Sequence, residues 1–311
     1  MKKRSLGEIE VSEVGFGGWG IGGDEYGNSY GPTEDDESVA AVRKARELGV
    51  DFFDTADVYG HGHSEEILAE AVETNSDDVR VCTKGGADFY QDGDMNFDSQ
   101  YIKYAAVKSI ERLRAEYIDV YMLQNPPRKA LSDPGTYESL KRMKNEGVIG
   151  QYGVSVHEPA EGRIAAETGD VDVVEVGFNI IKKGAKRDLF DYAEDNDVSI
   201  VAREPLANGF LTGKYDEDHT FRTTDMREGM PDELVRQRVR AGNELKSLVE
   251  EENKDYSPTQ AAIKYVLAHD AVSVTIPGAK TPEQVEENVA AATEYEPMSD
   301  EMVEKIESLV F

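Results

Sequence analysis

Basic residues are scarce in this sequence. Its 311 residues include 34 Lys and Arg against 63 Asp and Glu, which gives a formal net charge of −29 and an isoelectric point near 4.5. Nucleic acids select basic surfaces through their phosphate backbones, so this balance argues against DNA or RNA as a partner. The same excess of carboxylates argues against docking on an anionic membrane.

Cysteine and long apolar runs are also lacking. The one cysteine, Cys82, excludes an intramolecular disulfide, and its place in an apolar, strand-like run predicts a buried, inert thiol. No run reaches the roughly 18 apolar residues of a transmembrane helix. Residues 1–13 lack the apolar stretch of a signal peptide. These absences predict a cytoplasmic protein.

Apolar residues are few enough to raise the question of disorder. Leu, Ile, Val and Phe number 69 of 311, just above the ~20% below which a highly charged chain is disordered. They fall in compact runs with the acids between them, which indicates a folded protein. Its acidic surface suits either a salt-rich cytosol, where salt screens the repulsion, or an ordinary soluble protein. No single tail carries the excess, so we favour the first, halophilic interpretation.

Short β-branched runs alternate with stretches of helical period, which predicts a parallel sheet covered by helices. The strand-like runs are residues 14–17, 50–54, 79–83, 118–123, 149–154, 171–176, 198–201 and 272–276. The helical stretches include residues 34–48, 65–72, 101–114, 136–145 and 186–195. Eight such units predict an α/β fold, a (β/α)8 TIM barrel that makes residues 1–311 a single domain. A doubly wound sheet is the alternative.

Two segments fall outside the repeat. Residues 3–6 and 9–11 flank Gly7-Glu8, which predicts an N-terminal β-hairpin able to plug the bottom of the barrel. Residues 215–232, after the seventh strand, are long and polar. A loop of this length is typical of a lid or a cofactor clasp.

Three candidate catalytic residues lie at or after neighbouring strand ends. Asp54 ends the second strand, Tyr59 follows it, and Lys84 lies at the end of the third. Functional groups of a barrel gather at the carboxyl ends of its strands, so we expect these side chains to meet. A lysine beside a tyrosine lowers the pKa of the phenol, and an aspartate keeps the lysine charged and in place. The trio predicts a tyrosine that acts as general acid or base.

Five segments resemble the aldo-keto reductase family, in order and over essentially the whole chain: FFDTADVYG, VCTKGG, GVSV, PLANGFLTGKY and IPGAKTPEQVEEN. The resemblance implies an NAD(P)H-dependent barrel that reduces small aldehydes or ketones. Tyr59 would donate the proton to the carbonyl oxygen, Lys84 would adjust the pKa of Tyr59, and Asp54 would be the partner of Lys84. Gln124 stands where the family usually has a catalytic histidine. Its amide can donate a hydrogen bond but cannot carry a proton near pH 7.

The resemblance also implies cofactor contacts. Ser155 matches a residue that holds the nicotinamide carboxamide, Glu175 replaces the usual Gln, and Arg203 replaces a stacking aromatic residue. Backbone N–H groups freed by Gly209 would cradle the pyrophosphate, and Lys280 near a helix start would bind a 2′-phosphate, favouring NADPH over NADH. The expected cofactor residues are Gly18, Trp19, Asp54, Ser155, Glu175, Arg203, Pro205, Leu206, Ala207, Gly209, Lys214, Gly278, Lys280, Gln284, Glu287 and Asn288.

Two other functions stay open. The missing histidine leaves room for a nicotinamide-binding regulatory or auxiliary protein with little turnover. His61 and His63, two residues apart in a Gly-rich loop, are a weak signal for a metal-dependent hydrolase, but no third ligand is evident. We expect no metal and a substrate-facing loop there, with Trp19 and Tyr90 lining the substrate pocket. Neither the substrate nor the oligomeric state follows from the sequence.

Overall fold

The computed structural model describes residues 1–26, 29–89, 94–216 and 218–311. Its main sheet has eight parallel strands, neighbours in chain order: β3 (Phe16–Gly17), β4 (Phe52–Asp54), β5 (Arg80–Gly85), β6 (Ile118–Gln124), β7 (Ile149–Val156), β8 (Val173–Gly177), β9 (Ser199–Arg203) and β10 (Val272–Ile276). Parallel bridges from Val14 to Thr275 and from Gly17 to Gly278 bring the first strand against the last. The sheet is therefore nearly closed, which confirms the (β/α)8 barrel over the doubly wound alternative.

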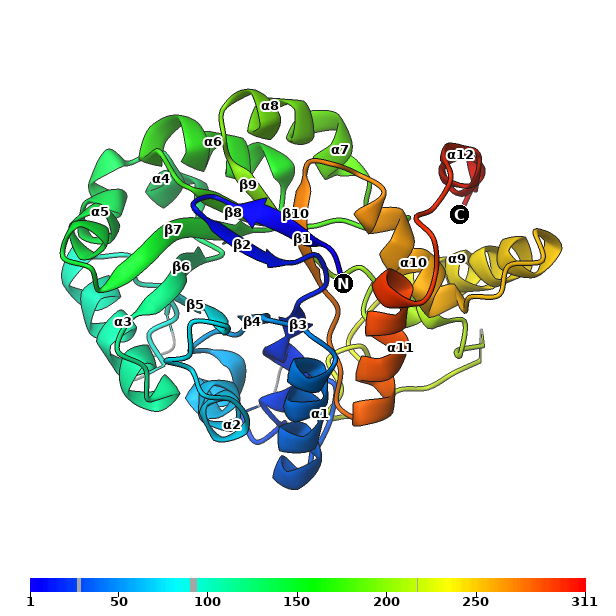
Figure 1. Cartoon of the computed structure of the whole chain (residues 1–311), viewed down its shortest axis with the longest axis horizontal. Helices are drawn as coiled ribbons and strands as arrows, with labels where there is room; N and C mark the ends of the chain where they lie inside the picture. The colour runs from blue at the N-terminus through cyan, green and yellow to red at the C-terminus, as the bar shows by residue number, and fades with distance from the viewer. Residues whose placement is uncertain (27–28, 90–93, 217) are drawn as a thin grey trace.

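Helices form a ring around the strands (Figure 1). They are α1 (Asp35–Glu47), α2 (His63–Ala71), α3 (Ser99–Leu113), α4 (Arg128–Leu131), α5 (Glu138–Asn145), α6 (Pro159–Gly169), α7 (Gly184–Asp188), α8 (Phe190–Asp195), α9 (Asp232–Glu251), α10 (Pro258–Leu267), α11 (Pro282–Thr293) and α12 (Asp300–Ser308). The helix expected over residues 186–195 is divided. Leu189 has φ −134°, outside the helical range, and separates α7 from α8.

The N-terminal hairpin closes one end of the barrel, as expected. Strands β1 (Lys3–Leu6) and β2 (Ile9–Ser12) cross that end in antiparallel register (Figure 1). Leu6 and Val11 are fully buried in one apolar cluster with inward side chains of the strands, Cys82 among them. This plug seals the bottom of the barrel and leaves the carboxyl ends of the strands for the site. Cys82 is the buried thiol that the sequence predicts.

The long loop before α9 folds onto its neighbours around Arg227. The Arg227 guanidinium donates to the Asn208 carbonyl oxygen (2.9 Å) and to the Tyr215 hydroxyl (2.7 Å), and it pairs with Asp225 (2.6 Å). It also lies 4.9 Å from the ring centroid of Tyr30. One residue of the expected clasp, number 217, lies outside the described residues. The described part joins the turn after β9 to the loop after β3.

A membrane span finds no support here. Within the ranges that the structure describes, no helix is both long and apolar enough to cross a membrane.

Candidate active site

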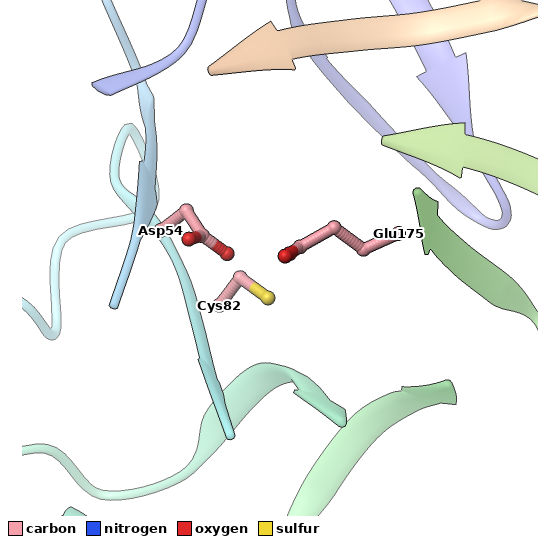
Figure 2. A group of neighbouring side chains, drawn as sticks. All are labelled: Asp54, Cys82 and Glu175. Atoms are coloured by element: carbon pink, nitrogen blue, oxygen red, sulfur yellow. The ribbon is translucent and has the colours of Figure 1, made fainter. Parts of the chain in front are cut away.

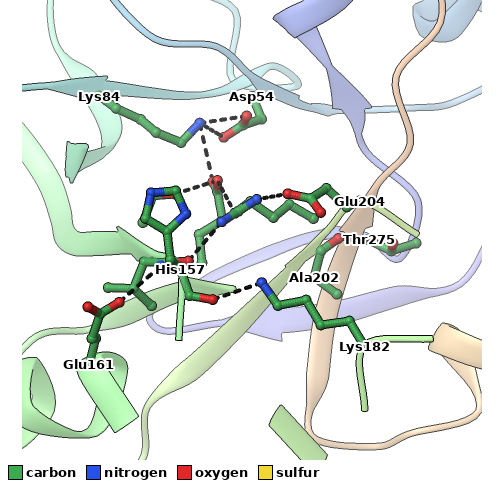
Figure 3. Close-up of polar contacts among 12 residues, drawn as sticks. Asp54, Lys84, His157, Glu161, Lys182, Ala202, Glu204 and Thr275 are labelled. Carbon is green, nitrogen blue, oxygen red and sulfur yellow. Dashed lines mark hydrogen bonds and ion pairs between the residues drawn. The ribbon is translucent and has the colours of Figure 1, made fainter. Parts of the chain in front are cut away.

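Lys84 is the centre of the site. Its side chain is completely buried, and its Nζ donates to both oxygens of Asp54 (2.6 Å each; Figure 3). The same Nζ donates to the carbonyl oxygen of Thr55 (2.9 Å). The Tyr59 hydroxyl lies 3.4 Å from the same Nζ. Strands β4 and β5 are paired with Asp54 opposite Cys82, which places Lys84 two residues further along β5. The three residues singled out in the sequence thus meet at one atom.

A second carboxylate lies against Lys84. Glu175, on β8, has its Oε2 3.2 Å from Lys84 Nζ and is 1% exposed. Ser155 donates its hydroxyl to Glu175 Oε1 (2.8 Å), so these two expected carboxamide contacts bond to each other. Arg203 lies beside them, with Nε 3.9 Å from Glu175 Oε1, and pairs with Glu204. The site is therefore a network of three carboxylates and two cations, in which Asp54, Glu175 and Lys84 are buried and Arg203 and Glu204 are half-buried.

Burial decides the protonation of Tyr59. Removal of its hydroxyl from water raises the pKa of Tyr59 well above its usual value, and the nearby Asp54 and Glu175 add to the rise. The Lys84 ammonium lowers that pKa but does not outweigh burial, so the lowered pKa expected from the sequence is wrong. A phenol with this pKa is protonated at neutral pH, which suits a proton donor.

The charges of the pair beneath Tyr59 depend on each other. Burial raises the pKa of Asp54, and the charge of Glu175 raises it further, while Lys84 opposes both effects. Burial alone would lower the pKa of Lys84, but Asp54 and Glu175 together hold it well above its usual range. Lys84 therefore remains an ammonium, which is the form that stabilises a phenolate.

Gln124 ends β6 beside Ser155, where the sequence places it. It is 7% exposed, and its Oε1 has no hydrogen-bond partner among the described residues. Within the same described ranges, Trp19 Nε1 and Arg203 Nε are also buried without a hydrogen-bond partner. Because unpaired buried polar atoms are costly, such atoms around one site indicate a polar ligand there. The residues present therefore fit a bound dinucleotide and its substrate.

The turn after β9 provides part of the expected cofactor surface. Arg203 Nη2 donates to the Val156 carbonyl oxygen (2.9 Å), which holds its guanidinium. Pro205 and Ala207 are buried, and Leu206 is half-buried. The N–H groups of Ala207 and Gly209 donate inside the turn, so these two N–H groups, expected at the pyrophosphate, already have backbone acceptors. Lys214 Nζ lies 4.9 Å from the ring centroid of Tyr215.

The segment between β10 and α11, together with α11 itself, carries the expected cofactor residues from Gly278 to Asn288. Lys280 Nζ donates to the carbonyl oxygens of Tyr30 (2.8 Å), Gly31 (3.1 Å) and Pro32 (3.4 Å). Gln284 accepts from the Lys280 N–H. The remaining expected contacts are also placed here: Gly278 accepts from Asn288 Nδ2 and bridges to Gly17, the neighbour of Gly18, and Glu287 accepts from Ser257. The residues on which the NADPH prediction rests therefore have protein partners.

The histidines after β4 turn to different partners. The ring of His61 stacks on Tyr26 at 4.1 Å and on Phe89 at 4.7 Å between centroids, while His63 Nε2 lies 2.9 Å from Asp35 Oδ1. Asp54, Cys82 and Glu175 do point toward one another (Figure 2). Lys84 forms ion pairs with both of those carboxylates, so its ammonium would repel a metal cation bound to them.

The aromatic residues expected at the substrate pocket are only partly described. The Trp19 ring lies 5.1 Å from that of Tyr59, close to the candidate proton donor. Tyr90, the other expected pocket residue, lies outside the described residues. His157 is exposed and receives a hydrogen bond from Lys182 at its carbonyl oxygen (Figure 3). These contacts place His157 in the loop after β7.

Sequence reasoning missed two contributors. The Thr55 carbonyl oxygen is a third acceptor for Lys84, and its place directly after Asp54 was an available signal. Tyr30 accepts from Asn208 (2.9 Å) and packs near Trp19, and burial raises the pKa of Tyr30 to about 12. These partners are 178 residues apart, so no local pattern links them.

Known proteins share this fold and sequence pattern. The profile of the aldo/keto reductase family matches residues 13–310. An uncharacterized oxidoreductase of Bacillus subtilis, YqkF, is 31% identical over 300 residues, which cover 94% of this chain and 91% of the relative. The holo form of aldo-keto reductase AKR11C1 from Bacillus halodurans has a TM-score of 0.81 and 27% identity, with coverage of 98% and 95%. The glycerol dehydrogenase AKR11B4 from Gluconobacter oxydans also gives 0.81 and 27%, with coverage of 98% and 93%.

A (β/α)8 barrel with this match is an oxidoreductase scaffold. The chain belongs to the aldo/keto reductase family, whose members use nicotinamide cofactors and act on small-molecule carbonyl substrates.

Proposed function

We propose that the protein is an NAD(P)H-dependent reductase of aldehydes or ketones, with Tyr59 as general acid. The observation that carries the proposal is the buried Lys84 Nζ, which contacts Asp54 at 2.6 Å and the Tyr59 hydroxyl at 3.4 Å. A positioned acid of this kind contributes to the rate when its proton moves to the reacting oxygen.

The proton path in this proposal is short. The Tyr59 hydroxyl donates its proton to the substrate carbonyl oxygen, and the Lys84 ammonium stabilises the phenolate left behind. Asp54 holds Lys84 in place through two hydrogen bonds. When bound, the reduced nicotinamide supplies the hydride. A raised pKa keeps Tyr59 protonated and ready to donate at neutral pH.

Gln124 has a positioning role in this mechanism. Its Nε2 amide group donates a hydrogen bond to the substrate carbonyl oxygen, which orients the carbonyl and stabilises the developing oxyanion. A glutamine does not titrate near neutral pH, so the transferred proton comes from Tyr59 alone.

The cofactor would lie along the carboxyl ends of the strands. Ser155 and Arg203 stand near the nicotinamide in this proposal, and the turn over residues 205–209 with Lys214 meets the pyrophosphate. Gln284, Glu287 and Asn288 meet the adenosine. We propose NADPH as the preferred form and NADH as the alternative, with Lys280 as the cation for the 2′-phosphate. That contact requires Lys280 to exchange its carbonyl partners.

A single-turnover experiment tests the proposed activity. Protein loaded with NADPH, and in parallel with NADH, is mixed with a panel of aldehydes and ketones in high KCl. We expect loss of cofactor absorbance at 340 nm within one turnover for at least one carbonyl class. Cofactor that binds but stays reduced over hours with every carbonyl would instead support a nicotinamide-binding regulatory protein.

We further propose that the protein works in a salt-rich cytoplasm. Its charge of −29 contrasts with the few cations at the cofactor surface, and the ligand is itself an anion. Salt screens the repulsion between the acidic surface and that anion. We therefore expect cofactor affinity, measured by fluorescence titration, to hold or rise from low salt to molar KCl. A steady fall with an intact circular dichroism spectrum would contradict the halophilic interpretation.

A further inference from the structure

Glu175 is bonded to the catalytic network itself. Its Oε2 lies 3.2 Å from Lys84 Nζ, and its Oε1 accepts from Ser155 at 2.8 Å. Figure 2 shows its carboxylate pointing across the barrel at Asp54 and Cys82, with one ligand atom from each of the three within 4.8 Å of the others. A contact with the nicotinamide alone does not account for this placement.

Two carboxylates share one ammonium at this point. Asp54 and Glu175 are buried to 3% and 1% exposure, and both face Lys84, which is completely buried. Arg203 approaches Glu175 to 3.9 Å but is paired with Glu204. Cys82 adds no charge, because burial raises the pKa of its thiol well above its usual value. The positive charge of Lys84 is thus already paired with the carboxylates of Asp54 and Glu175 before a phenolate forms on Tyr59.

In this arrangement, the property that distinguishes Glu175 from a glutamine is its charge. A glutamine in the same place would accept the same hydrogen bond from Ser155 through its amide oxygen. It would not oppose a negative charge on Tyr59, whose hydroxyl lies 3.4 Å from the Lys84 Nζ that Glu175 also contacts. In a site with low water content, one such charge changes the energy of a phenolate substantially.

We propose that Glu175 is a positioning residue that acts through its ion pair with Lys84 and sets the upper pH limit of proton donation by Tyr59. The inference rests on the proposed reductase activity. The negative charge of Glu175 disfavours a phenolate on Tyr59, so the phenol stays protonated as pH rises. Asp54 remains bonded to Lys84 by two contacts without it, so removal of Glu175 leaves the ammonium in place.

The test compares pH profiles of single-turnover reduction for the wild type and Glu175→Gln. With the carboxylate neutralised, we expect the rate to begin its fall about one pH unit lower than in the wild type. Alcohol oxidation should reach its plateau at correspondingly lower pH, because equilibrium ties the two directions together. Glu175→Asp keeps the charge, and its profile should lie between the two. Cofactor affinity should change less than about threefold in all of them.

Each outcome decides the inference. An unchanged profile in E175Q would overturn it, because the charge of Glu175 would then have no effect on proton donation by Tyr59. A weakened cofactor affinity with an unchanged profile would also overturn it and assign Glu175 to the carboxamide. Glu175→Ala gives a second neutral variant should E175Q not fold. Absence of reduction in the wild type is a different result, because it removes the proposed function itself.

Discussion

Replacing Tyr59 with phenylalanine is expected to lower the single-turnover rate of carbonyl reduction by roughly 10³-fold, within the range of a lost general acid. The substitution removes one hydroxyl, whose contact with Lys84 is a long 3.4 Å. The ring keeps its place against Trp19, 5.1 Å away between centroids. Cofactor affinity should therefore stay within about twofold of the wild-type value.

The matched control is Tyr117→Phe. That substitution also removes a phenolic hydroxyl, one that donates to Asp119 (3.1 Å) near the start of β6, at the opposite end of the strand from Gln124. Its reduction rate should equal that of the wild type. Retained reduction in Y59F, with both proteins folded, would remove Tyr59 from the proton path and leave the mechanism without its acid.

The fold could be predicted because short runs of neighbouring residues indicate most of its strands and helices. The barrel strands are short runs whose residues are mostly buried, as in β6, where all seven residues are buried. The plug was predictable from two short runs around Gly7-Glu8. The break at Leu189 was not, because the segment keeps helical composition while its backbone leaves the helical range.

The site likewise has a part that local sequence predicts and a part that it does not. Asp54, Tyr59 and Lys84 lie at the ends of neighbouring strands, so strand order alone brings them together. The pairing of Glu175 with Lys84 depends on side chains that reach across the barrel, from β8 to β5. No pattern of neighbouring residues in the sequence indicates that these two side chains meet. The protonation of Tyr59 was misjudged for a similar reason, because the cost of burial outweighs the charge of one neighbour.

Replacing Lys84 with methionine is expected to have the largest effect on stability. It leaves the carboxylates of Asp54 and Glu175 buried without their shared cation. Removing one partner of a buried ion pair costs about 3–5 kcal/mol of the free energy of unfolding. Urea unfolding in molar KCl measures that loss directly. Reduction should also fall by at least about 10²-fold, because the phenolate of Tyr59 loses its stabilising charge.

The loss in K84M should depend on pH. An Asp whose pKa in the folded state lies above its unfolded value binds more protons when folded, so stability falls as pH rises above about 4. Burial and Glu175 raise the pKa of Asp54 already, and removing Lys84 takes away the charge that opposes them. The deficit relative to wild type should therefore be smaller at pH 5 than at pH 8. Equal deficits at the two pH values would contradict a buried-charge origin.

A surface pair provides the control. Lys103 lies 3.3 Å from Glu146, with side chains 50% and 46% exposed. Lys103→Met should cost less than about 1 kcal/mol, because water screens that pair. The double variant K84M/E175Q should recover part of the K84M loss, since only one carboxylate is then left buried. The two losses in the free energy of unfolding, from K84M and from E175Q alone, could instead add in the double variant. That result would show that the two residues act independently and would contradict a shared network.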